Sequence, residues 1–142
     1  MARDFDGGST DRITTTLTTH STQRSFSIWV WRDTGAADVG RMFDKRVAGG
    51  QVEIFFYISA SGLYQYERAW SGDDGLWYIT APSADGWHNV ILTYDASATT
   101  NDPVFYVDGS SVAVGQTGGN PTGSLSTNTD AYVVGNRGDH VT

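Results

Sequence analysis

Carboxylates are the residues of this chain that could carry out hydrolysis, and their spacing does not favour it. The sequence holds fourteen Asp and two Glu. Retaining hydrolysis of a glycoside needs two carboxylates about 5 Å apart, one acting as the acid and the other as the nucleophile. Glu53 and Glu67 fall on different expected strands. Asp73 and Asp74 are neighbours in a glycine-flanked turn, where adjacent side chains diverge into solvent. We therefore predict that the protein is not an enzyme, and a glycan-active hydrolase is the alternative.

Aromatic side chains are the second group that could bind a ligand, because the C–H face of a sugar ring stacks on an aromatic ring. Most of them fall in alternating strand patterns and are expected in the core. Trp70 instead lies at the mouth of a loop, between Arg68 and a turn rich in Gly and Asp, and we expect it to be exposed. The sequence predicts a ligand-binding group made of Trp70, Tyr64, Tyr66 and Asp73.

The three histidines, His20, His88 and His140, are too scattered to suggest a zinc site. His88 follows Trp87 at the start of an alternating run, and we expect both side chains to be packed, His88 as a hydrogen-bonded framework residue. No nucleophile-elbow pattern is present. Because the chain has no Cys, thiolate chemistry and disulfides are excluded.

The charge balance excludes a phosphate-binding surface. Eight Arg and one Lys stand against sixteen acidic residues, for a net charge of −7 at pH 7, so we expect no nucleic-acid partner. No apolar run is long enough to span a bilayer, and residues 1–20 lack the apolar core of a signal peptide. We expect no membrane insertion. An extracellular or virion-associated location is favoured, reached through a segment outside this chain or by incorporation into a virus particle.

The pattern of apolar residues predicts an all-β, antiparallel two-sheet sandwich that forms a single domain over residues 1–142. No stretch keeps apolar residues at helical spacing for a dozen positions, whereas short alternating runs are separated by turns rich in Gly, Asn, Asp and Ser. In the run 25–32, Phe26, Ile28 and Val30 alternate with Trp29 and Trp31, which suggests a central strand buried on both faces. Residues 115–130 are expected to form a long surface loop. Strands are expected over 2–6, 12–17, 25–32, 41–46, 51–58, 63–68, 76–79, 87–95, 104–107, 111–114 and 131–135.

A set of short motifs, taken in chain order, resembles the laminin G-like, concanavalin A-like jelly-roll family. They cover nearly the whole chain, and each is weak alone, whereas their order and spacing are fairly specific. The resemblance implies two antiparallel sheets packed face to face, and a non-catalytic module that binds glycans or proteins. The motifs are Asp4–Gly7, Ser25–Val30, Gly86–Val90 with Thr93–Asp95, Phe105–Gly109 and Val133–Asn136.

One departure from the family concerns its closing strand, a segment of the type Gly-x-Ile-Asp-Glu. The sequence instead ends with Gly138–Thr142. In this fold the closing strand lies beside the first one, so its absence would leave backbone groups unpaired next to Ala2–Asp6. A truncated gene, a strand supplied by a partner and a dimer that covers the gap are all open explanations. We expect a homo-oligomer or a strand-completing partner at this edge.

The resemblance also implies a calcium ion at one end of the sheets, since calcium takes carboxylate and carbonyl oxygens as ligands. Asp4, Asp6 and Asp95 are the residues that would bind it. Solvated acidic surface is the alternative. Taken together, the residues and the resemblance predict a non-catalytic recognition or assembly module that binds carbohydrate, another surface polymer or a protein. It would be part of a phage particle or of a larger adhesive protein, with a purely structural subunit as a further alternative.

Overall fold

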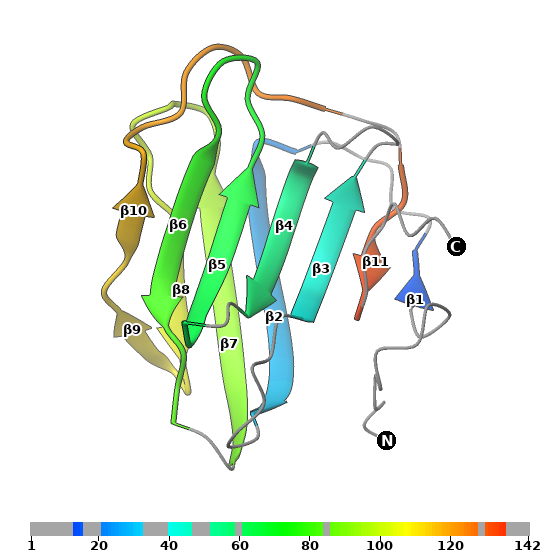
Figure 1. Ribbon diagram of the computed structural model, residues 1–142, viewed down its shortest axis with the longest axis vertical. Helices are drawn as coiled ribbons and strands as arrows, with labels where there is room; N and C mark the ends of the chain where they lie inside the picture. The colour runs from blue at the N-terminus through cyan, green and yellow to red at the C-terminus, as the bar shows by residue number, and fades with distance from the viewer. Residues whose placement is uncertain are drawn as a thin grey trace.

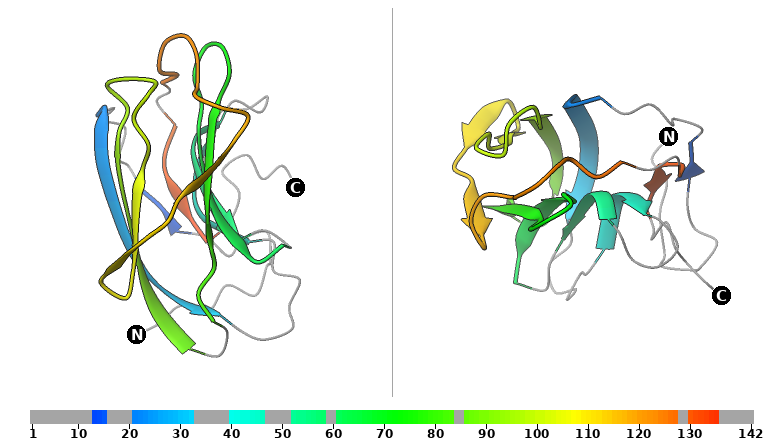
Figure 2. Two further views of the ribbon diagram at one scale, coloured as in Figure 1. Left: turned by 90° about the vertical axis from the view of Figure 1, so that its left-hand side faces the viewer. Right: turned by 90° about the horizontal axis from the view of Figure 1, so that it is seen from above.

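A computed structural model describes residues 13–15, 21–32, 40–46, 52–58, 61–83, 86–127 and 130–135 of the chain. All regular structure in these residues is β-strand, and every strand pair is antiparallel (Figure 1). The strands form two sheets that pack face to face as separate layers (Figure 2). The predicted all-β sandwich is therefore confirmed. Among the described residues there is no helix that could cross a membrane.

The larger sheet has seven strands and the smaller one has four. The order in the larger sheet is β1 (Ile13–Thr14), β11 (Val133–Val134), β3 (Gly40–Arg46), β4 (Val52–Ile58), β5 (Leu63–Arg68), β6 (Gly75–Thr80) and β10 (Gly115–Thr117). The order in the smaller sheet is β2 (Gln23–Arg32), β7 (Gly86–Asp95), β8 (Val104–Val107) and β9 (Ser110–Val112).

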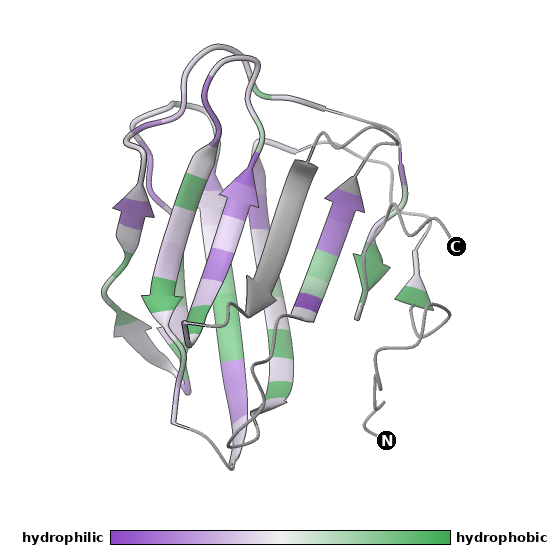
Figure 3. Cartoon of the chain, in the orientation of Figure 1, coloured by the Kyte–Doolittle hydropathy of each residue, from purple (hydrophilic) through white to green (hydrophobic). Residues whose placement is uncertain are grey.

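The pairing of β2 with β7 is the longest among the described strands. It runs without a register shift from Gln23 opposite Asp95 to Arg32 opposite Gly86. Successive side chains of a strand point to opposite faces of the sheet. Phe26, Ile28 and Val30 of β2 therefore lie on the inner face, and Figure 3 shows the alternation as green and pale bands along the strand.

Strand β10 lies in a segment that we expected to be loop. It pairs with β6 at the edge of the larger sheet, with Gly115 opposite Tyr78. A Cβ atom at Gly115 would overlap the Tyr78 ring, so glycine lets the two strands approach under that ring. The abundance of glycine that indicated a loop thus also permits a short edge strand. Strands β1 and β11 are shorter than expected, and the expected strand over 2–6 lies outside the described residues.

The core between the sheets is mainly aromatic. Tyr66 of β5 stacks on Trp77 of β6, with ring centroids 5.9 Å apart, and both contact the Tyr94 ring of β7 at 5.5 and 5.0 Å. The Trp77 indole N–H donates a 2.8 Å hydrogen bond to the Asp102 carboxylate. The side chains therefore join the two sheets at their centre by ring contacts, which add about 0.5–1.5 kcal/mol per pair beyond the area they bury.

Two buried charges of the larger sheet are held by specific contacts. Asp44 of β3 is buried and forms an ion pair with Arg41. The ammonium group of buried Lys45 lies 4.8 Å from the centre of the Tyr132 ring, which is a cation–π geometry. Successive residues of β3 thus direct opposite charges to opposite faces of the sheet.

Two of the core tyrosines, Tyr66 and Tyr94, make stability at high pH a test of this packing. Burial raises the pKa of Tyr94 to about 12, against the opposing effect of the Arg68 charge, and burial also raises the pKa of Tyr66. A group with a raised folded pKa stabilises the fold below its unfolded pKa of 10.0, and this contribution is lost as pH rises through the folded value. We expect part of the phenolate absorbance to appear only when the protein unfolds, above pH 10. Tyr94→Phe should reduce this late part of the absorbance by the contribution of one tyrosine. Ionisation of all seven tyrosines in one step in the native protein would contradict this packing.

Gly75 provides a second test, because its Cα lies under the Trp77 ring. A Cβ atom there would overlap the ring, which is fully buried and has no room to move away. We expect Gly75→Ala to lower the free energy of unfolding by about 1–3 kcal/mol, the usual range for overpacking a core. Gly40→Ala is the matched control, since a Cβ at Gly40 would meet nothing within 4 Å. Equal free energies of unfolding for the two variants in chemical denaturation would refute the close packing of Trp77 on the backbone.

Candidate functional site

The predicted ligand-binding group does not form a surface. Tyr64 and Tyr66 are buried in the core, and Trp70 is 7% exposed, so the expected exposure of Trp70 is wrong. Trp70 pairs with Leu125 through an isolated backbone bridge. Backbone hydrogen bonds join the loop that contains Leu125 to the hairpin between β5 and β6. The Trp70 side chain belongs to the core cluster, against which Leu125 packs.

Asp73, the remaining member of that group, is exposed and takes part in the contact between the two loops. Its carboxylate accepts a 3.0 Å hydrogen bond from the Thr122 hydroxyl, and its backbone N–H donates to the same hydroxyl at 2.9 Å. Backbone hydrogen bonds from Ser71 to Ser124 and from Gly72 to Thr122 continue the contact. These bonds give Asp73 a framework role that the sequence, read strand by strand, does not reveal.

Of the three residues predicted to bind calcium, only Asp95 is in the described part of the chain, since Asp4 and Asp6 lie outside it. The Asp95 carboxylate accepts hydrogen bonds from Gln23 Nε2 at 3.1 Å and from the Ser97 N–H at 2.9 Å, and these bonds lower its pKa. It lines a hollow of about 410 Å³ together with Arg24, whose positive charge disfavours a cation there. No group of three metal-ligating side chains occurs among the described residues. Calcium binding stays a prediction, as does the subunit interface at 2–6, which lies outside the described residues.

The exposed aromatic residues lie instead on the outer face of the smaller sheet. Trp29 is 64% exposed, Trp31 52% and Trp87 49%. We call these three residues the tryptophan face. The prediction that these residues are packed in the core is wrong, because the larger sheet covers only the inner face of β2, which the aliphatic residues between the tryptophans occupy. The signal that could have found them is this alternation, since aliphatic residues are more often fully buried than tryptophan.

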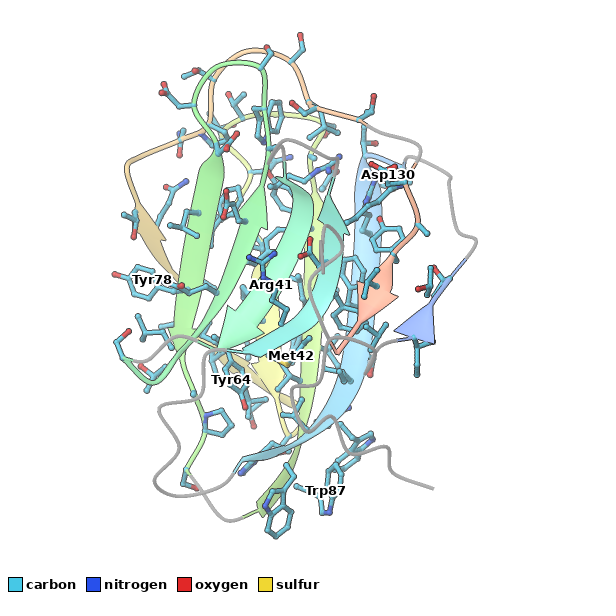
Figure 4. All side chains as sticks on the ribbon, turned by 45° about the vertical axis from the view of Figure 1, so that its right-hand side comes forward. Arg41, Met42, Tyr64, Tyr78, Trp87 and Asp130 are labelled. Atoms are coloured by element: carbon cyan, nitrogen blue, oxygen red, sulfur yellow. The ribbon has the colours of Figure 1, made fainter. Side chains whose placement is uncertain are left out.

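The tryptophan face is a compact cluster at one end of the sandwich. Trp31 lies opposite Trp87 in the β2–β7 pairing, and their ring centroids are 5.8 Å apart at an angle of 69°, an edge-to-face arrangement. Trp29 is two residues from Trp31 on the same face of β2. Figure 4 shows Trp87 at the lower end of the molecule, outside the space between the sheets.

Uncharged polar groups lie beside Trp29. Asn89 lies opposite Trp29, and its Nδ2 donates weak hydrogen bonds across the sheet to the Ile28 carbonyl at 3.3 Å and the Ser27 hydroxyl at 3.4 Å. These bonds orient the amide beside the indoles. Its Oδ1 is an acceptor of the kind to which sugar hydroxyls donate.

A hydrogen-bonded group anchored by His88 positions Trp87. The ring nitrogens of His88 lie 2.7 Å from an Asp108 carboxylate oxygen and 3.0 Å from the Ser83 carbonyl oxygen. Asp108 also accepts a 2.9 Å hydrogen bond from the Asn89 N–H. His88 thus connects the loop before β7 with the turn after β8, and its expected role as a framework residue is confirmed. The backbone that follows Trp87 is thus held in place through His88 and Asn89, although the Trp87 ring itself is exposed.

The two antiparallel layers define a β-sandwich of the jelly-roll class. A family model described as the concanavalin A-like lectin/glucanases superfamily, Laminin_G_3, matches residues 6–142. The chain belongs to this family, which confirms the resemblance seen in the sequence. In general terms it is a carbohydrate- or protein-binding module. Because the family contains both lectins and glucanases, the lack of catalysis stays a prediction. A search of curated proteins gave no significant match.

The contact between His88 and Asp108 makes the stability of this region depend on acid pH. Hydrogen bonds from the His88 side chain and the Asn89 backbone lower the pKa of Asp108. A carboxyl with a depressed folded pKa stabilises the fold above its unfolded pKa of 3.8, and this contribution is lost as pH falls through the folded value. We expect Asp108→Asn to melt a few degrees below the wild type at neutral pH. The difference in melting temperature should vanish once the pH falls below the folded pKa of Asp108, where the wild-type carboxyl is also uncharged.

Asp130→Asn is the matched control, since Asp130 is an exposed carboxylate elsewhere on the surface. It should melt like the wild type throughout the pH range. If Asp108→Asn also does so, the hydrogen bonds of Asp108 do not hold the strand that carries Trp87.

Proposed function

We propose that the protein is a non-catalytic glycan-binding module and that the tryptophan face is its contact surface. The observation that carries this proposal is the exposure of Trp29, Trp31 and Trp87 on one face of one sheet. In such a role the domain would recognise a surface polymer on behalf of a phage particle or a larger adhesive protein.

Exposure of three clustered indoles needs a reason, because apolar surface left in water forgoes about 25 cal/mol per Å² of stabilisation. Single exposed apolar residues are ordinary, whereas a contiguous exposed patch indicates an interaction site. Trp31 and Trp87 contact each other, and Trp29 lies on the same face, two residues before Trp31 on β2. The cluster therefore has the properties of a binding surface.

The chemistry of the surrounding residues favours a glycan ligand. Sugar rings present C–H faces that stack on indoles, and hydroxyls that bond to amides and other hydroxyls. Asn89, Ser27 and Thr93 provide such groups beside or along the tryptophan face. Within the described part of β2 and β7, the outward positions next to the indoles hold no carboxylate pair that could serve as acid and nucleophile. This arrangement supports binding without hydrolysis.

Replacement of single tryptophans tests the proposal. On a glycan array followed by calorimetric titration, we expect Trp29→Ala, Trp31→Ala and Trp87→Ala each to weaken binding by about 1–2 kcal/mol, as expected for an aromatic residue at a binding surface. Their melting temperatures should change little, because the side chains are exposed. Val104→Ala is the control, since Val104 is an exposed apolar residue of β8 in the same sheet.

Two results would contradict this proposal. Unchanged glycan binding by folded tryptophan variants would assign recognition to another surface. A dimer in light scattering that dissociates when Trp31 or Trp87 is replaced would show that the face joins copies of the chain, which is the structural role considered as the alternative.

A further inference from the structure

We propose that the ligand of the tryptophan face is an uncharged glycan recognised as a separate, soluble chain, and not as the flat surface of a crystalline polysaccharide. This inference rests on the proposed function and specifies its ligand class. It is argued from the angle between two rings and from the charges around them.

The angle between the indoles excludes a flat contact. The planes of Trp31 and Trp87 are 69° apart. A planar polysaccharide surface can lie parallel to only one of two rings at this angle. The two rings instead form a corner, in which one pyranose stacks on one indole while the other indole bounds its side.

The position of Trp29 extends this corner along one direction. Residues two apart on a strand lie on the same face with Cα atoms roughly 7 Å apart. Trp29 therefore follows Trp31 along β2, whereas the position opposite Trp29 on β7 is polar Asn89. A chain that seats one sugar in the corner can place a following sugar on Trp29, with its hydroxyls directed to Asn89.

The charge distribution favours a neutral ligand. The protein carries a net charge of −7. On the outer face of the described strands, the positions from Ser25 to Trp31 on β2 and from Trp87 to Thr93 on β7 hold only uncharged side chains. Among the described carboxylates, Asp95 lies at the far end of β7, and Asp108 is engaged by His88. An anionic glycan would meet no cation among these outward side chains and would be repelled by the molecule as a whole.

Paired forms of the same sugars test this inference. Cellohexaose, chitohexaose and mannohexaose serve as soluble probes, and crystalline cellulose, chitin and mannan serve as the matching surfaces. We expect at least one soluble probe to bind, and the double variant Trp31→Ala/Trp87→Ala to lose about tenfold or more of that affinity. Retention on the crystalline surfaces should be the same for the wild type and the double variant. Oligogalacturonate, the anionic probe, should bind at least about tenfold more weakly than the best neutral one.

Each contrary result has a separate meaning. Tryptophan-dependent retention on a crystalline surface without binding of its soluble oligosaccharide, or tighter binding of oligogalacturonate, would overturn this inference and leave the proposed function standing. Absence of tryptophan-dependent binding to every probe would overturn both.

Circular dichroism establishes that the double variant is folded, and Trp29→Ala, which leaves the corner intact, provides a second variant. Trp29→Ala should weaken binding of a hexasaccharide more than that of the corresponding disaccharide, and equal losses would contradict the extended path along β2.

Discussion

The pairing of β2 with β7 is the constraint on which the rest of the structure depends. It joins ten residues of each strand without a register shift, so the face on which every side chain lies is set along the whole length. Only one face of this sheet is covered by the larger sheet. A slip of one residue would exchange the two faces and bring the tryptophans into the core in place of the aliphatic residues. The inner packing and the exposed tryptophan face are thus two consequences of one register.

The inner face explains why this register is stable. Phe26 packs on Phe43 of the opposite sheet with ring centroids 5.2 Å apart, and Val90 and Leu92 contribute aliphatic surface from β7. At the centre, the rings of Tyr66, Trp77 and Tyr94 contact each other across the two sheets. Aromatic side chains are rigid and bury a large area, so a small number of them can hold two sheets together without helices or disulfides.

The outer face has a different physical character. It keeps three indoles in water beside uncharged polar groups, and His88 with Asp108 fixes the end of β7 that carries Trp87. A binding surface placed on a paired sheet, and not on loops, loses little conformational entropy when a ligand binds, because its backbone is already ordered. The family to which the chain belongs includes lectins and glucanases, and the role that we propose for the tryptophan face is binding.

Several features could be predicted from single strands. The alternation in residues 25–32 and 87–95 indicates the two long strands, and Asp108–Gly109 indicates the turn between β8 and β9, where the structure has positive φ at both residues. The same local patterns misplaced Trp70. Its surroundings in the sequence are polar, yet Leu125, more than fifty residues later, pairs with its backbone, and its side chain belongs to the core cluster.

The sequence by itself therefore determined the class of fold and the two long strands, because these depend on the period of a strand. It also indicated a framework role for His88, although the partners of that side chain, Ser83 and Asp108, are set by the fold. Only the tertiary structure decided which aromatic residues meet water. That outcome depends on which face of the smaller sheet is covered and on where the long loop packs, and both are set by contacts between segments far apart in the chain. Trp29 and Trp31 have the same local pattern as core residues, and they are exposed because no strand of the opposite sheet packs on their side.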